Sequence, residues 1–211
     1  KAEAKSGYDG FALKVNSAGV VEMLLHMVSD GELNLAGTTT DDDQNIHLVG
    51  SFTGKLSVGF LEIESKGQSD LFILSWSKDG DLLNLQGIGG EGDEMATSAS
   101  YSDGAIILGG YFSDSFDYGN SQQSSGGGTD GFVLSISVLN FNQVNWFMPL
   151  TGSSDESIRA LDAGSDGSLF FAGSFGGTSS LGGVEVVSRG LSDAIVGKLG
   201  SDGQVDYLRT G

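Results

Sequence analysis

The feature that most constrains the fold of this chain is a short phrase, an aspartate followed by an apolar run, that returns at nearly constant spacing. Its four copies are Tyr8-Asp9-Gly10-Phe11-Ala12-Leu13-Lys14, Ser69-Asp70-Leu71-Phe72-Ile73-Leu74-Ser75, Thr129-Asp130-Gly131-Phe132-Val133-Leu134-Ser135 and Ser192-Asp193-Ala194-Ile195-Val196-Gly197-Lys198. The aspartates lie at positions 9, 70, 130 and 193, so successive copies are 61, 60 and 63 residues apart. A repeat of this length is a supersecondary unit used several times. We therefore expect an array of similar units.

Each unit reads as strands and turns, because short apolar or alternating runs are separated by Gly, Ser, Asp and Asn. The expected strands are residues 11–15, 20–27, 32–38, 46–52, 56–63, 71–76, 82–88, 95–101, 105–112, 132–138, 144–150, 157–162, 168–175, 184–187, 194–199 and 205–208. The two segments with some helical pattern, 20–27 and 157–161, occupy positions that read as strands in sister units. With 35 glycines, one proline and 38% apolar residues, the composition predicts an all-β globular fold rich in turns.

Two further patterns support the repeat. Dipeptides that tolerate positive φ predict tight hairpin turns at Asp79-Gly80, Asp103-Gly104, Asp166-Gly167 and Asp202-Gly203. A second phrase places a glycine in mid-strand, two residues before an aromatic: Gly50 with Phe52, Gly110 with Phe112, and Gly173 with Phe175. We expect each glycine to allow a close approach of backbones between packed sheets, and each aromatic to fill the core beside it.

With both phrases in register, the unit resembles the SBBP-type, or β-propeller-repeat, family of bacterial and archaeal surface and secreted proteins. The best matching run is Gly173-Ser174-Phe175 through Gly190, residues 192–199 and Gly203, and Asn145-Trp146 supplies the strand tryptophan of the third unit. The resemblance covers essentially the whole chain after Gly7. Three segments depart from it, at residues 28–31, 41–45 and 138–143.

The resemblance implies a β-propeller-like array of four-stranded antiparallel blades in a single domain over residues 1–211. It implies a half blade at about 8–28 and blades at about 32–88, 95–150 and 157–208, which is about three and a half blades. A closed ring generally needs at least about four blades, so we expect this array to be partial. Its open sheets would then meet the remainder of a larger propeller or another copy of the chain.

Charge and composition exclude several kinds of partner. The net charge of −18, from ten Lys plus Arg against 28 Asp plus Glu, opposes binding to nucleic acid and to anionic membranes. Cysteine is absent and no run of 18 apolar residues occurs, which excludes disulfides and a transmembrane helix. Residues 1–7 lack an apolar leader segment, so the chain is cytosolic, already processed, or cut from something longer.

Several acidic and glycine-rich segments offer groups that could form a chemical site. Asp41-Asp42-Asp43 offers oxygen ligands for calcium, but the sequence lacks the alternating acidic array of a calcium loop, so we expect a hydrated hairpin tip. Asp93-Glu94 and Asp155-Glu156 offer paired carboxylates for acid–base catalysis, yet their recurrence favours structural hydrogen bonds. Residues 87–92 are glycine-rich, but no helix follows to make a phosphate site.

The two histidines, His26 and His47, lie in different strands and have no nucleophile partner in a recognisable context. We therefore assign no catalytic, cofactor-binding or metal-ligating residue, although calcium stays open. The expected function is a non-catalytic structural or interaction module, a rigid platform at the cell surface or outside the cell. The alternative is a carbohydrate-binding module that stacks sugars on Trp76, Trp146, Tyr111 and Tyr118. A secreted hydrolase or lyase is the least supported class, because no convergent polar group is recognisable.

Overall fold

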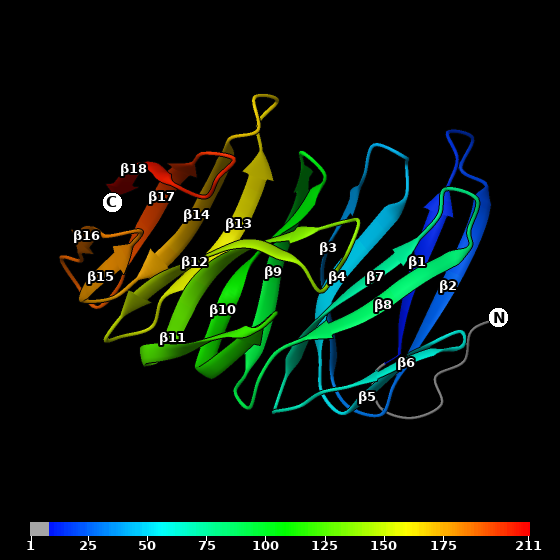
Figure 1. Ribbon diagram of the computed structural model, residues 1–211, viewed down its shortest axis with the longest axis horizontal. Helices are drawn as coiled ribbons and strands as arrows, with labels where there is room; N and C mark the ends of the chain where they lie inside the picture. The colour runs from blue at the N-terminus through cyan, green and yellow to red at the C-terminus, as the bar shows by residue number, and fades with distance from the viewer. Residues whose placement is uncertain (1–8) are drawn as a thin grey trace.

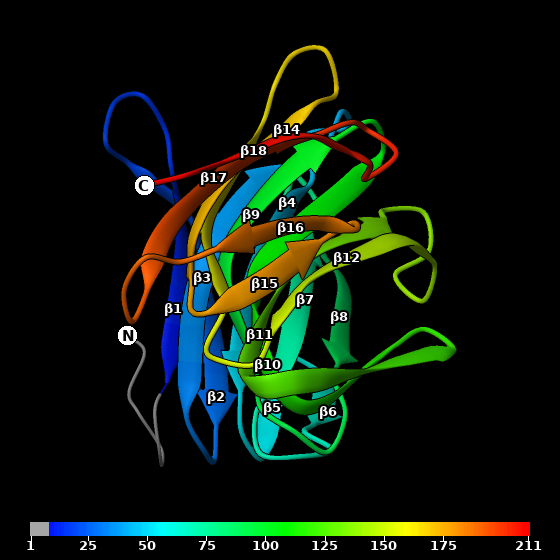
Figure 2. The same ribbon diagram turned by 90° about the vertical axis from the view of Figure 1, so that its left-hand side faces the viewer.

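A computed structural model describes residues 9–211, which form four antiparallel β-sheets and no helix (Figures 1 and 2). The first sheet has the order β1 (Gly10–Val15), β2 (Val21–Ser29), β5 (Lys55–Val58), β6 (Leu61–Glu64). The second has the order β3 (Leu33–Thr40), β4 (Ile46–Phe52), β7 (Asp70–Trp76), β8 (Leu82–Ile88). The all-β prediction is confirmed. Tyr8, which opens the first copy of the phrase, lies outside the described residues.

The third sheet has six strands and the fourth has four. The third has the order β9 (Glu94–Ser102), β10 (Ala105–Tyr118), β11 (Ser121–Ser137), β12 (Val144–Gly152), β15 (Thr178–Leu181), β16 (Val184–Val187). The fourth has the order β13 (Ser157–Ala163), β14 (Leu169–Phe175), β17 (Asp193–Leu199), β18 (Val205–Thr210). In each of the last three sheets, four strands nearly consecutive in the chain form an antiparallel meander, as the repeat predicted.

Two short hairpins cross from one sheet to the one before it, and of their four strands only β16 (Val184–Val187) matches an expected strand. Residues 56–63 were expected to be one strand, but they form the hairpin β5–β6, which turns at Gly59 with φ of 60°. This hairpin pairs with β2, so Met27 lies opposite Val58. The hairpin β15–β16 pairs with β12 in the same manner, and its first strand was not expected. Each hairpin therefore ties two successive sheets together by backbone hydrogen bonds.

The third sheet differs from the second and fourth. The segment that corresponds to the two crossing hairpins lies between β10 and β11, and it lengthens the hairpin that these two strands form. Strands β10 and β11 continue past the predicted limits and pair as far as Tyr118 and Ser121, with a register shift between Ser113 and Ser115. Phe116, in this extension, is fully buried in the core between the second and third sheets. The extension therefore fixes the sheets by an aromatic side chain instead of an added strand pair.

Successive sheets pack face to face, and one apolar core fills each of the three junctions. Phe52, Phe112 and Phe175, the aromatics of the second phrase, are at most 1% exposed, which confirms their predicted core position. The junction of the second and third sheets is the most aromatic, with Phe112, Phe116 and Phe132 in mutual ring contact. Each sheet thus buries an apolar face only by packing on its neighbour.

The mid-strand glycines permit a close approach, but the approaching backbone is not in a packed sheet as expected. A Cβ at Gly50, Gly110 or Gly173 would overlap a carbonyl oxygen of the adjacent strand in the same sheet. Each adjacent strand has a β-bulge near this point, and a glycine inside a strand often marks a bulge or a close approach of another backbone. The glycines are therefore required by the bulges.

The predicted Asp-Gly turns are confirmed. Gly80, Gly104, Gly167 and Gly203 all have positive φ, between 77° and 98°, the backbone region that favours glycine. At Asp103-Gly104 the aspartate is also at positive φ, 50°, as in the tightest hairpin turns. In Figure 1 the first and fourth sheets lie at opposite ends of an open row. The described sheets do not form a closed propeller.

Candidate functional site

The two ends of the row present apolar faces that no sheet formed by residues 9–211 covers. At one end, β1 points Phe11, Leu13 and Val15 outward, and these side chains are 61%, 47% and 49% exposed. Leu24 of β2 lies opposite Leu13 and is also exposed. We call these four residues the N-terminal face. Large apolar side chains gathered on one sheet surface mark an interaction site in soluble proteins.

The repeat shows what normally covers such a face. Counted from the recurrent aspartates, Phe11 and Leu13 correspond to Phe132 and Leu134 in the third sheet. Both residues of the third sheet are completely buried against the second sheet. The N-terminal face therefore has the composition of an internal junction, and within residues 9–211 no preceding sheet covers it.

The other end shows the converse arrangement on β14, β17 and β18. Phe170, Val196 and Tyr207 are 44%, 47% and 40% exposed, and Ala172 lies beside them. We call these four residues the C-terminal face. The counterparts of Phe170 and Val196 in the third sheet are Ile107 and Val133, which are buried against the fourth sheet.

Cations lie over the aromatic rings of the C-terminal face. The ammonium of Lys198 is 5.8 Å from the centre of the Phe170 ring, and the guanidinium of Arg209 is 5.5 Å from that of Tyr207. Such contacts hold the charged groups near an apolar surface. The C-terminal face thus carries two of the ten cationic side chains of a strongly acidic chain.

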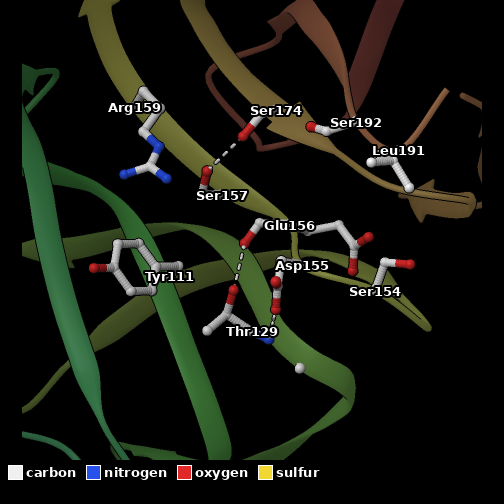
Figure 3. Close-up of a pocket in the computed structure, with 11 residues that line it drawn as sticks. Tyr111, Thr129, Ser154, Asp155, Glu156, Ser157, Arg159, Ser174, Leu191 and Ser192 are labelled. Atoms are coloured by element: carbon white, nitrogen blue, oxygen red, sulfur yellow. Dashed lines mark hydrogen bonds between the residues drawn. The ribbon is translucent and has the colours of Figure 1, made fainter.

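A polar cavity of about 510 Å³ lies between the third and fourth sheets (Figure 3). Its walls carry the hydroxyls of Thr129, Ser157 and Ser174, with a hydrogen bond of 3.0 Å between the last two. Asp155 accepts a hydrogen bond from the backbone N–H of Thr129. No histidine lines this cavity, so a Ser–His nucleophile cannot be assembled from its walls.

Tyr111 and Arg159 form one wall of the cavity, where the guanidinium lies 5.4 Å from the centre of the ring. A second cavity of about 400 Å³ begins on the other side of this pair. Both residues depart from the repeat: Ser51 and Ser174 occupy the position of Tyr111, and Ala36 and Thr97 occupy the bulge position of Arg159. Arg159 was not identified from the sequence, although its departure from the repeat was a signal that could have found it.

The recurrent aspartates fix the loop that precedes their strand. Asp70, Asp130 and Asp193 accept hydrogen bonds from backbone N–H groups four residues earlier, at Lys66, Gly126 and Arg189. The Asp9 carboxylate also lies 2.9 Å from Nε2 of His26. The phrase therefore recurs for a local structural reason.

The acidic pairs of the sequence analysis divide between surface and core. Glu94 and Glu156 are fully buried, and their carboxylates accept backbone hydrogen bonds from Gly90 and Gly176. Burial, together with the nearby charges of Asp70, Asp93 and Asp117, raises the pKa of Glu94 to about 8 against the opposing hydrogen bond from Gly90. Burial also raises the pKa of Glu156. The glycine-rich segment 87–92 thus surrounds a carboxyl group, which a phosphate site would not.

The Asp41-Asp42-Asp43 tip is more ordered than expected. Asp41 accepts hydrogen bonds from the backbone and side chain of Asn45 and from His47, and Asp42 accepts one from Tyr101. Burial raises the pKa of Asp41, but these hydrogen bonds outweigh it and bring that pKa below its usual value. Burial lowers the pKa of His47, whose Nδ1 lies 2.7 Å from the Ser75 hydroxyl. In residues 9–211, no three His, Asp or Glu side chains are grouped closely enough to hold a metal ion.

The four candidate stacking residues lie in three different environments. Trp76 is 2% exposed in the core of the first junction, so it cannot receive a sugar. Tyr111 belongs to the polar cavity. Tyr118 and Trp146 are half-buried and line a separate hollow at the outer edge of the third sheet.

Comparisons with protein-family models and with curated proteins find no match for this chain. The resemblance to the β-propeller-repeat family therefore stays a prediction. No helix that could cross a bilayer occurs in the described part of the chain.

Proposed function

We propose that this chain is a non-catalytic interaction module, a segment of β-propeller blades that serves as a rigid platform outside the cell or at its surface. Its partner is a second copy of the chain, which docks head to tail. The observation that carries the proposal is that equivalent side chains are buried at the internal junctions and exposed at the two ends. Docking the C-terminal face of one copy on the N-terminal face of the next would reproduce an internal junction.

The three internal junctions support this mode of assembly. Each consists of a continuous apolar core, and two of them are reinforced by a crossing hairpin. A head-to-tail contact uses two different surfaces, so it builds a ring when the rotation between copies closes and a filament when it does not. Both products give the repeated, rigid surface that the proposal requires.

Blocked faces test this proposal. Leu13→Lys places a charge on the N-terminal face, and Val196→Lys places one on the C-terminal face; neither increases the negative charge of the chain. Each variant alone is expected to sediment as a monomer, because one face of every possible contact is blocked. An equimolar mixture retains one intact face of each kind and is expected to form a heterodimer and nothing larger. Leu191→Lys is the control, since Leu191 is 99% exposed outside both faces.

The mixing experiment separates the possible outcomes. Wild type and Leu191→Lys are expected to form larger species as concentration rises. If the mixture stays monomeric, the faces do not dock on each other, and a second copy is not their partner. In that case a further sheet of a longer polypeptide becomes the occupant to test.

Carbohydrate binding is a second candidate function. The hollow that contains Tyr118 and Trp146 supports it, because aromatic rings and amide side chains occur there together. Saturable binding of an oligosaccharide to the wild-type chain tests it.

A further inference from the structure

We infer that the hollow at the outer edge of the third sheet binds a short segment of a neutral carbohydrate. This inference deepens the second candidate function and does not depend on head-to-tail docking. The hollow has a volume of about 530 Å³, within the range of roughly 300–1,000 Å³ typical of small-ligand sites. We call it the amide hollow, and its principal side chains are Tyr118, Asn120, Asn142, Gln143, Asn145 and Trp146.

Two departures from the repeat meet to form the amide hollow. One is the extended β10–β11 hairpin, which turns at Gly119 and Asn120. The other is the turn at 138–143 between β11 and β12, which is longer than the Asp-Gly turns at the same place in the second and fourth sheets. A Cβ at Gly119 would lie 3.7 Å from the carbonyl oxygen of Asn142, so the two segments are in contact. A repeat accounts for structure that recurs, and these two segments do not recur.

The chemistry of the walls selects an uncharged, hydroxyl-rich ligand. No Asp, Glu, Lys or Arg lines the hollow, although 18% of the chain is charged. The side chains of Asn120, Asn142 and Gln143 are exposed and make no hydrogen bond within residues 9–211. An amide both donates and accepts hydrogen bonds, as a sugar hydroxyl does. Ions would find no opposite charge here.

The aromatic walls are held in place before any ligand arrives. The indole N–H of Trp146 donates to the carbonyl of Ser201 at 3.0 Å, and a Cβ at Gly203 would lie 2.7 Å from the indole ring. Tyr118 stacks on Phe147 with 4.2 Å between ring centres. Rigid rings provide an apolar surface for the C–H face of a pyranose at little cost in conformational entropy. The hollow therefore combines fixed rings with free amides.

The test uses the fluorescence of Trp146 in a Trp76→Phe background, where it is the only tryptophan. The probes are cello-, manno-, galacto- and chito-oligosaccharides, with polygalacturonate as an anionic comparator. We expect saturable binding of at least one neutral oligosaccharide. Gln143→Ala is expected to weaken it by about fivefold, and Asn120→Ala with Gln143→Ala by about tenfold or more, as for the loss of one and two hydrogen bonds.

The matched control is Gln204→Ala. Gln204 holds the position of Gln143 in the fourth sheet, one residue before the last strand, and lies outside the hollow. It is expected to bind as the parent does. Binding that survives in the double variant overturns this site but leaves carbohydrate binding as a function. Absence of binding by every neutral probe overturns both, as does preference for polygalacturonate over all of them. Head-to-tail docking is measured separately, by sedimentation.

Discussion

Phe132 and Phe11 hold the same place in their repeats, yet one is completely buried and the other is 61% exposed. The strands that carry them have the same apolar alternation, so the difference does not come from local sequence. It comes from the preceding sheet, which covers Phe132 and has no counterpart beside Phe11 within residues 9–211. The comparison shows that each apolar sheet face in this array is covered by a neighbouring sheet, except at the two ends of the row.

The largest expected effect separates these two phenylalanines. Phe132→Ala is expected to lower the free energy of unfolding by about 3–5 kcal/mol, because it leaves a cavity in a packed core. Phe11→Ala is expected to change it by less than about 0.5 kcal/mol, because the side chain meets solvent in the isolated chain. Urea unfolding of both variants, at a concentration that keeps copies apart, measures the difference. Equal losses would break the comparison.

The next effect concerns buried carboxyl groups. At an internal junction, the buried Glu94 lies near the recurrent Asp70. At the open C-terminal end, the recurrent Asp193 has no such glutamate beside it in the described residues. The folded-state pKa of Glu94, about 8, is above its unfolded value of 4.5, so the folded chain binds the proton more tightly. Stability from this group is therefore full below about pH 4.5 and is lost as pH rises toward 8. We expect a loss of about 1.4 kcal/mol per pH unit in that window.

Glu94→Gln provides the control for this pH dependence. His47, whose pKa is lowered, acts in the opposite direction below about pH 6.5, so thermal unfolding is compared from pH 7 upward. The variant is expected to unfold with a flatter pH profile than the parent. A parent profile that is already flat between pH 7 and 8 would mean that the carboxyl is ionised in the folded chain.

Two glycine substitutions compare a close-packed position inside a sheet with an open position outside the strands. Gly110→Ala is expected to cost about 1–3 kcal/mol, because the new Cβ overlaps the Met95 carbonyl and the Phe132 ring. Gly190→Ala meets no atom within 4 Å and is expected to be nearly neutral. Chemical unfolding of the two variants checks this, and a neutral Gly110→Ala would mean that the bulge beside it relaxes easily.

Salt is expected to have the smallest effect, and only on the open faces. Copies with a net charge of −18 repel one another, and the repulsion is screened as the Debye length falls from about 10 Å at 0.1 M to about 3 Å at 1 M salt. Association is therefore expected to strengthen by a few-fold across this range. Sedimentation at the two salt concentrations checks it; weaker association in high salt would indicate ion pairing in place of apolar docking.

Much of the fold could be predicted because period and turn chemistry are local. The residues of β4 were predicted without error, and the Asp-Gly turns have the expected backbone. The crossing strand β15 was missed because Thr178-Ser179-Ser180 has no apolar alternation, and its stability comes from pairing with β12. The β10–β11 extension was missed because residues 121–129 are rich in Ser, Gln and Gly and resemble a loop.

The candidate sites depended more on contacts between units, which the sequence does not encode locally. In the sequence, Glu94 resembles an ordinary acidic residue of a turn. Its burial follows from packing around Asp70 and the β10–β11 extension. Tyr118 and Trp146 were identified as aromatic candidates, but the exposed amides beside them come from two segments more than 15 residues apart. Comparing each unit with its sisters would have located these departures.

Sedimentation velocity of the wild-type chain over a wide range of concentration tests the central claim most directly. If the end faces are uncovered junctions, the sedimentation coefficient rises with concentration, and Leu13→Lys abolishes the rise. A single monomeric species at every concentration, with solubility undiminished, would contradict head-to-tail docking between copies.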